Sequence, residues 1–180
     1  FQTLIDRLIE KIKDNGGQVI LNQEIQQIEK VNTNYKILNT KYAVVISTLP
    51  TPVFLKIAPK IPPKFHQTIS KIDHLWAQTL VLELDKPFLN KTYWLNINDN
   101  PFPFLAVVEH TNFIENSHYG NHHLLYIGNY LPDGHPYLTK SADELLQLFT
   151  PYLKRINPHY ELLNTNYQLR LFSIPFAQPI

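Results

Sequence analysis

Residues 42–50 read YAVVISTLP, a short aliphatic run that ends on Ser47 and Thr48 and then on a proline. An apolar run of this length, bounded by a turn signal, is typical of a buried strand. Proline fixes the backbone φ angle and has no N–H group, so a regular strand ends where it meets Pro50. The stretch therefore predicts a strand over residues 42–48 and a change of chain direction directly after it.

The residues before this stretch predict a helix followed by short strands. The apolar residues of 3–13 recur at helical spacing, and the sequence DNGG at 14–17 provides a stop. Thr3 and Asp6 have the spacing of a capping box at the start of this helix. Three further short strands are predicted, over residues 18–21, 23–30 and 35–38.

Beyond Pro50 the sequence predicts one short helix and then longer strands. Five prolines in residues 50–63 leave room only for a helix over about residues 53–57. Ser141 and Glu144 form a second capping-box pattern, which opens an amphipathic helix that Pro151 must kink or restart. Strands are predicted over residues 75–84, 92–97, 104–108, 123–131 and 166–172. The chain thus reads as α+β, a mixed, largely antiparallel β-sheet with helices packed on one face.

The composition excludes several classes of protein. The 180 residues are 44% hydrophobic and 17% charged, an ordinary globular balance. Sixteen basic and fifteen acidic residues without a basic block give no reason to expect a nucleic-acid partner. Without cysteine there is no disulfide and no thiolate nucleophile. No apolar run reaches the roughly 20 residues that span a bilayer, so we expect a cytoplasmic protein, with peripheral membrane contact left open.

The first 50 residues follow an order that resembles a known family: an amphipathic helix, a Gly-Gly pair, VILN, EIQQI, a hairpin and YAVVISTLP. This order is similar to the mid-chain segment of FAD-dependent oxidoreductases of the amine oxidase, protoporphyrinogen oxidase and phytoene desaturase type. The runs EHTNFI, YIGNYLP and AQPI also resemble one bacterial, amine oxidase-like branch. The resemblance implies that residues 1–50 are a partial FAD-lobe segment and residues 51–180 the substrate-binding domain. Because the last residues are apolar, we expect a piece of a longer chain.

The resemblance also implies which residues meet the ligands. The cofactor-binding positions, mostly through backbone atoms, are Ile25, Thr48 and Pro50. His110 and Asn112 lie at the end of a dense predicted strand, where site residues often lie, and Tyr126 is one of several tyrosines that could line an apolar cavity. In an intact flavoenzyme we expect these three residues to face the substrate, which is expected to be small and apolar or flat. No catalytic residue is expected, because the isoalloxazine of a flavoenzyme carries out the hydride or electron transfer. The tyrosine could equally be a core or rim residue of the sheet, and His110 a structural histidine.

These 180 residues lack the family's G-x-G-x-x-G fingerprint. There are only five glycines, and none forms a loop that could cradle a phosphate. The resemblance therefore implies FAD in the full-length protein, but we expect no tight FAD binding and no turnover by this chain alone. A face that the missing lobe would cover could let the chain self-associate.

The sequence also bears on three other functions: a metal site, a serine hydrolase and a binding module. His122 and His123 are adjacent on a predicted strand, where side chains point to opposite faces, so no metal site is expected. Asp73 and His74 are not accompanied by a G-x-S-x-G elbow, so a serine hydrolase is not expected. The alternative that stays open is a non-catalytic binding module whose tyrosine-rich sheet recognises a peptide, lipid or glycan. A reading frame with an upstream G-x-G-x-x-G would favour the enzyme.

Overall fold

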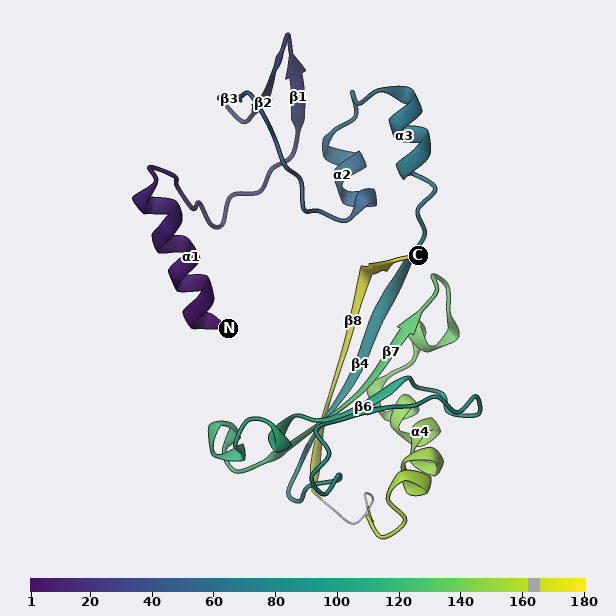
Figure 1. Ribbon diagram of the computed structural model, residues 1–180. Coiled ribbons are helices and arrows are strands. Elements are labelled where there is room, and N and C mark those ends of the chain that lie inside the picture. Colours follow the sequence, from purple (N-terminus) through teal and green to yellow (C-terminus); the bar gives the residue numbers. More distant parts are fainter. Residues whose placement is uncertain (162–165) are drawn as a thin grey trace. The chain divides into compact units, whose positions relative to one another are not determined.

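The computed structural model describes residues 1–161 and 166–180, and these divide into two compact units, Phe1–Ser70 and Lys71–Ile180 (Figure 1). The boundary lies after Ser70, later along the chain than the predicted boundary at Pro50. Helices α2 (Thr51–Ile57) and α3 (Pro63–Ile69) belong to the first unit, because they line one cavity together with residues that precede Pro50. The functional assignment of the two predicted parts stays a prediction.

The first unit begins with helix α1 (Gln2–Asp14), which confirms the predicted helix. Its N-cap is Phe1 and has no side-chain hydrogen bond, so the predicted capping box is wrong. Asp6 is instead engaged by Gln2, whose Nε2 donates to Oδ1 at 2.8 Å. The predicted stop is confirmed, because Gly16 adopts a φ of +79° directly after the C-cap residue.

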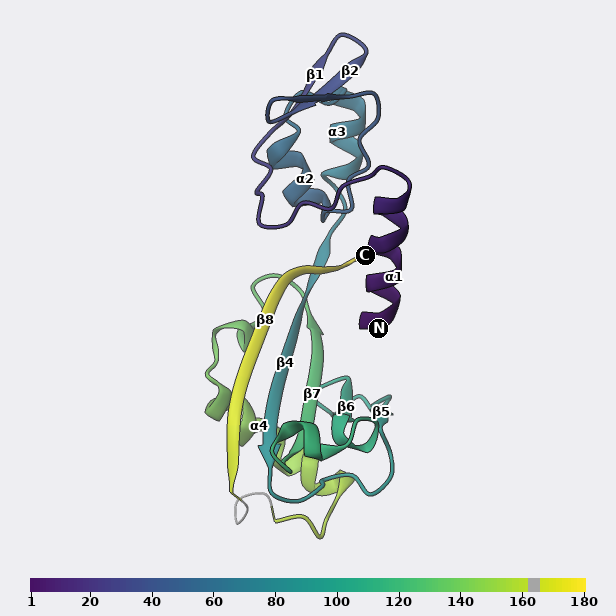
Figure 2. The ribbon, with the colours of Figure 1, turned by 90° about the vertical axis from the view of Figure 1, so that its left-hand side faces the viewer.

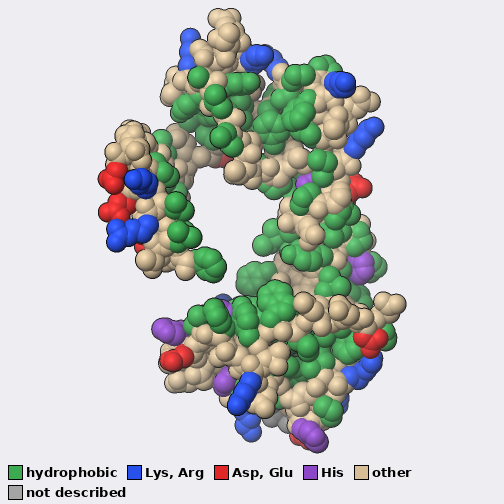
Figure 3. Space-filling view, in the orientation of Figure 1, with side chains coloured by type: hydrophobic (Ala, Val, Ile, Leu, Met, Phe, Trp, Pro, Cys, Tyr) green, Lys and Arg blue, Asp and Glu red, His purple; other side chains and the backbone are tan. Residues whose placement is uncertain are grey.

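One side of α1 is apolar and exposed. None of its residues is buried, and Leu4, Ile5, Leu8 and Ile12 are 44–59% exposed. Figure 3 shows these hydrophobic side chains along one side of α1 and charged side chains along the other. We call these four residues the α1 stripe.

A three-stranded antiparallel sheet follows, in the order β1 (Ile28–Val31), β2 (Asn34–Ile37) and β3 (Thr40–Tyr42). The predicted strands over residues 18–21 and 42–48 are wrong, because residues 18–21 and 43–48 have no strand conformation. Val44 and Ile46 are 72% and 86% exposed, while Val45 between them is half-buried and lines a cavity of this unit. An apolar run becomes a strand only where a neighbouring strand can pair with it.

Helix α3 was not predicted. Prolines at Pro62 and Pro63 suggested a break, but Pro63 occupies the first turn of α3, where a missing N–H costs nothing. The neighbouring helix α2 matches the predicted short helix and has Pro50 as its N-cap. The carbonyl of Pro50 accepts from the N–H groups of Val53 and Phe54 at 3.0 and 2.9 Å. The turn at Pro50 therefore starts a helix.

The second unit holds a five-stranded sheet in the order β5-β6-β7-β4-β8, with every pairing antiparallel. The strands are β4 (His74–Leu84), β5 (Trp94–Asn96), β6 (Ala106–Glu109), β7 (His123–Leu131) and β8 (Tyr167–Pro179). Figure 2 shows β8, β4 and β7 side by side. All five strands were predicted, although β8 is longer than expected. The α+β, largely antiparallel class is confirmed, with two antiparallel sheets where one was predicted.

The described residues of the second unit also contain three 3-10 helices and one long α-helix. They are η1 (His110–Asn112), η2 (Asn116–Tyr119), η3 (Pro136–Thr139) and α4 (Ala142–Ile156). The predicted capping box at Ser141 and Glu144 is present in both directions. Of the two predicted effects of Pro151, a kink or a restart, the restart does not occur, since α4 passes through this residue as one helix.

The core lies between α4 and one face of the five-stranded sheet. Leu80, Leu82 and Leu84 of β4 are at most 1% exposed and pack in one cluster with Leu145 and Phe149 of α4. Because side chains alternate along a strand, the residues between these leucines point to the opposite face of the sheet. We call that opposite side the open face.

Candidate functional site

The open face carries a cavity of about 710 Å³, which we call the trough. It is lined by Thr79, Val81, Glu83, Tyr119, Leu124, Tyr126, Gln168, Arg170 and Phe172. Most of these residues come from three neighbouring strands, β7, β4 and β8, and Tyr119 comes from η2. A volume of this size falls in the range of small-molecule sites.

The strand register places the lining residues in three rows across β7, β4 and β8. The rows are Leu124–Glu83–Gln168, Tyr126–Val81–Arg170 and Gly128–Thr79–Phe172. Neighbouring strands lie about 4.8 Å apart, so the backbones of Tyr126 and Arg170 are roughly 10 Å apart across Val81. The central row therefore sets an aromatic ring opposite a guanidinium, with a short aliphatic side chain between them.

Tyr119 and Tyr126 line one side of the trough, and His110 contacts both of them. The His110 ring stacks on Tyr126 with a centroid distance of 5.5 Å and an interplanar angle of 22°. His110 Nε2 is also within hydrogen-bond distance of the Tyr119 hydroxyl, at 2.7 Å. Burial raises the pKa of the Tyr126 phenol, and nearby Tyr119 and Tyr93 raise it further. The Tyr126 hydroxyl is therefore a neutral donor and acceptor at the edge of the trough.

The trough contains one acidic and one basic side chain in different surroundings. Glu83 Oε1 lies 3.7 Å from His122 Nε2, and the other ring nitrogen of His122 lies 3.7 Å from Asp85. Arg170 is exposed, and it makes no ion pair with another residue of the described segments. The Arg170 guanidinium can thus donate hydrogen bonds to an anionic ligand in the trough.

A buried carboxylate supports the start of η1. Glu109 is fully buried, and its Oε2 accepts from the backbone N–H groups of Phe88 and Leu89, each at 3.0 Å. Thr111 donates to Oε1 at 3.2 Å. Burial raises the pKa of Glu109, and these three hydrogen bonds oppose the rise. Glu109 directly precedes His110, so its hydrogen bonds hold the backbone from which His110 contacts Tyr119 and Tyr126.

The three predicted substrate-facing residues take different positions. Tyr126 lines the trough, and His110 contacts two of its tyrosines. Asn112 instead holds a loop, since its Nδ2 donates to the carbonyls of Leu89 at 3.2 Å and Thr92 at 3.0 Å. That all three face a substrate stays a prediction.

Sequence reasoning did not select Tyr119, Phe172 or Arg170 as site residues. The available signal was the alternation of the last strand, which puts Arg170 on the face opposite Leu169 and Leu171. That signal names a face of β8, and only the strand register shows which residues of β4 and β7 share it.

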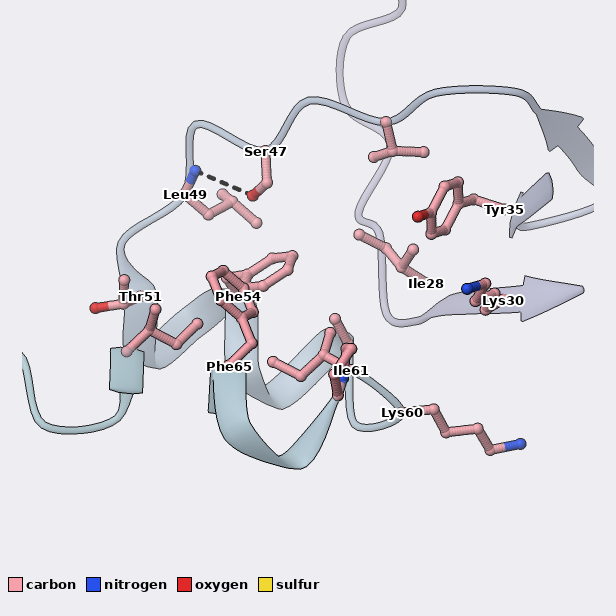
Figure 4. A pocket seen from close by; sticks show the side chains of 14 residues that line it. Ile28, Lys30, Tyr35, Ser47, Leu49, Thr51, Phe54, Lys60, Ile61 and Phe65 are labelled. Carbon is pink, nitrogen blue, oxygen red and sulfur yellow. Dashed lines mark hydrogen bonds between the residues drawn. The ribbon is translucent and has the colours of Figure 1, made fainter. Parts of the chain in front are cut away.

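The first unit contains a separate cavity of about 540 Å³. Ile28 and Tyr35 lie on one side of it, and Phe54 of α2 and Phe65 of α3 on the other (Figure 4). Ser47 and Leu49 also line it, and Leu49 N–H donates to Ser47 Oγ at 3.4 Å. The end of segment 22–28 and the corner around Thr48 therefore lie together.

The predicted cofactor positions Ile25, Thr48 and Pro50 are not among the residues that line this cavity, although the lining residues Ser47, Leu49 and Thr51 flank Thr48 and Pro50 in the chain. Ile25 and Pro50 are half-buried and Thr48 is exposed. Their contact with a cofactor stays a prediction.

The glycines do not provide a pyrophosphate site. Gly16 and Gly17 follow the C-terminus of α1, and Gly17 N–H donates back to the carbonyl of Ile12 at 2.8 Å. A Cβ at Gly17 would lie 2.7 Å from Ile12 Cγ2, so this glycine is needed for the close return of the chain. A phosphate cradle needs free N–H groups at the start of a helix. Gly16 and Gly17 therefore do not form such a cradle, and the expected absence of tight FAD binding by this chain stays a prediction.

His122 and His123 have different partners. His122 lies near Glu83 and Asp85, and His123 lies near Glu109 and Asn116. Within residues 1–161 and 166–180, no three His, Asp or Glu side chains are grouped so that they could hold a metal ion. None of the helices in the same segments is long and apolar enough to cross a bilayer.

Comparison with known proteins gives structural matches only. No family model and no curated protein matches the sequence. An oxidoreductase from Methanosarcina mazei matches 94% of this chain with a TM-score of 0.68 and 19% identity. A protein assigned as a protoporphyrinogen oxidase from Exiguobacterium sp. 255-15 matches 97% with a TM-score of 0.65 and 16% identity. A reduced UDP-galactopyranose mutase matches 92% with a TM-score of 0.60 and 13% identity.

The chain covers 40%, 39% and 37% of these three proteins, respectively. It thus spans about two-fifths of the length of each structure that it matches. The agreement extends over both compact units, because each unit is far larger than the unmatched remainder. The chain therefore has the fold of a part of these proteins, which is the fold that the resemblance to the protoporphyrinogen oxidase type predicts.

Proposed function

We propose that this chain is the substrate-binding region, together with an adjoining part of the FAD lobe, of an FAD-dependent oxidoreductase of the amine oxidase and protoporphyrinogen oxidase type. The observation that carries the proposal is the structural match, which covers most of both units, to an oxidoreductase and to a protein assigned as a protoporphyrinogen oxidase. Because the chain spans about two-fifths of those proteins, the activity of a whole enzyme would need further residues.

The α1 stripe supports this proposal. An amphipathic helix with four exposed apolar residues and no buried residue normally has a partner surface. In the proposed enzyme, the remainder of the FAD lobe covers the stripe. That remainder also supplies the glycine-rich turn for the pyrophosphate, which this chain lacks.

The chain's own contribution would be to bind and orient the substrate. A bound flavin supplies hydride or electron transfer, so the surrounding protein needs no general base for the redox step. The trough provides an aromatic wall, an aliphatic floor at Val81 and one cation at Arg170. Such a surface suits a small, flat substrate.

The test is to express the intact reading frame that encodes this chain and to record the visible spectrum of the purified product. We expect the two absorption bands of an oxidised flavin, which dithionite bleaches and air restores. The 180-residue chain, mixed with FAD and passed through a desalting column, is the control and should retain no flavin. An intact product that neither carries nor takes up FAD would overturn the proposal.

A non-catalytic module that recognises a peptide, lipid or glycan is the second candidate. The tyrosines at the trough and the absence of a pyrophosphate cradle favour it. The same preparation separates the two candidates, because the module predicts a folded intact product without flavin.

A further inference from the structure

We propose that the trough binds a planar aromatic monocarboxylate, with its ring over Val81 and Thr79 and its carboxylate on Arg170. This inference deepens the proposed function, on which it rests for describing the ligand as a substrate. The binding itself depends only on the open face of the five-stranded sheet.

The shape of the trough selects a flat ligand. Its floor is formed by Val81 and Thr79, and the neighbouring position on β7 is Gly128. A Cβ added at Gly128 would meet no atom within 4 Å, so the space beside Thr79 is open. Tyr126 and Phe172 lie on opposite sides of β4, on β7 and β8. The backbones of β7 and β8 lie two strand spacings apart, roughly 10 Å. The cavity volume of about 710 Å³ is large enough for one fused ring system.

The aromatic wall is held in place by its own contacts. Tyr126 is stacked on His110, and His110 is in turn within 2.7 Å of the Tyr119 hydroxyl. The ring of Tyr126 therefore has a fixed orientation before a ligand arrives. Fixed aromatic rings pair with a ligand ring in offset or edge-to-face geometry, which adds specificity for aromatic over aliphatic ligands.

The charges select a single carboxylate. The planar guanidinium of Arg170 can form two parallel hydrogen bonds with a carboxylate, and no ion pair within the described segments competes for it. Glu83 lies on the same face of β4, two residues from Val81, which is directly opposite Arg170. A second anionic group at the Glu83 end of the trough would be repelled. A monoanion with its charge at one end fits this layout.

Binding of 2-naphthoate to the 180-residue chain, measured by isothermal titration calorimetry, tests the proposal. The neutral analogue 2-naphthalenemethanol has the same ring without the carboxylate. We expect saturable binding of 2-naphthoate and roughly 10- to 100-fold weaker binding of the alcohol, as for the loss of a charged hydrogen-bonded pair. Arg170→Gln should weaken 2-naphthoate by the same factor and leave the alcohol unchanged.

Arg7→Gln is the matched control, because Arg7 is an exposed arginine of α1 that pairs with Glu10. It should bind 2-naphthoate as the unchanged chain does. A second variant, Gly128→Leu, fills the open floor without altering charge, and its backbone φ is not positive. It should abolish binding of both probes while tryptophan fluorescence shows a folded second unit.

Equal affinity for the two probes, full binding by Arg170→Gln, or full binding by Gly128→Leu would overturn the proposal. The flavin content of the intact product tests the proposed function separately from the binding of 2-naphthoate. If 2-naphthoate binds as described but the intact product carries no flavin, the trough is a ligand site of a protein that is not a flavoenzyme.

Discussion

Replacement of the buried Glu109, the residue directly before η1, by alanine should lower the unfolding free energy of the second unit if its carboxylate holds the surrounding backbone. Glu109→Ala leaves the backbone N–H groups of Phe88 and Leu89 without an acceptor in a place where both residues are at most 8% exposed. Each stranded buried donor costs about 1–3 kcal/mol. The variant should therefore lose about 2–6 kcal/mol of unfolding free energy, since two donors are affected.

Glu109→Gln should behave differently. Both N–H groups bond to the same carboxylate oxygen, so a single amide oxygen can accept them both. The amide nitrogen would then donate to the Thr111 hydroxyl, which now donates to the other oxygen. Because no charge is buried, the unfolding free energy at pH 7 should be unchanged or higher than that of the original chain.

The pH dependence follows from the direction of the pKa shift. Burial raises the pKa of Glu109 above its ordinary value of 4.5 in the folded state. The folded state therefore holds this proton more tightly than the unfolded state, and stability falls as pH rises from 4.5 through the raised value. Glu109→Gln lacks this loss, so its advantage should grow over that window. His123, whose ring nitrogen lies 3.9 Å from Glu109, is present in both proteins.

Urea denaturation followed by tryptophan fluorescence measures these differences, because Trp76 and Trp94 both belong to the second unit. Glu115→Ala, an exposed replacement, is the control and should change stability by less than about 0.5 kcal/mol. If Glu109→Ala were as stable as Glu109→Gln at pH 7, the hydrogen-bonding role of this carboxylate would be refuted.

Three further predictions concern Asn112, the α4 cap and the α1 stripe. Asn112→Ala should lower the unfolding free energy by about 1–2 kcal/mol in the same urea assay, because two loop carbonyls lose their donor. Unchanged stability with lost ligand binding would instead make Asn112 a ligand contact. Ser141→Ala should cost about 1 kcal/mol by removing the cap of α4, and Ser117→Ala should cost nothing measurable. Leu8→Glu should reduce self-association of the chain in light scattering, because it places a charge in the exposed α1 stripe. A strictly monomeric parent chain at high concentration would contradict that prediction.

The second unit was largely predictable from the sequence, because its elements bury one face against a continuous core. In β4 the leucines at 80, 82 and 84 alternate with polar or smaller residues, and α4 starts at a capping box. In β4 and α4 the hydrophobic pattern of the sequence matches the face that is buried in the core. The fold class could therefore be predicted from these segments.

The first unit shows where such reasoning fails. The run at 42–48 has the composition of a strand, yet Val44 and Ile46 are exposed and no partner strand pairs with them. The apolar composition of a segment indicates that other residues should pack on it, but it does not indicate which residues. Helix α3 was missed because its first turn contains Pro63, and a proline in a sequence is usually taken to end a helix.

The candidate site was predicted only in part. Tyr126 was selected as one of several tyrosines that could line a cavity, and His110 for its place at the end of a dense strand. Arg170 belongs to no motif, and its importance comes from lying opposite Val81 and in one row with Tyr126. Register between strands that are distant in the sequence cannot be read from a single chain.

The most direct test is a titration of the flavin-loaded product of the intact reading frame with 2-naphthoate, followed in the visible spectrum. If the trough holds the substrate of a flavoenzyme, the flavin bands should shift as the ligand binds, and Arg170→Gln should require a higher ligand concentration for the same shift. Binding that calorimetry detects while the flavin bands stay unchanged would contradict it, because ligand and flavin would then occupy unconnected sites.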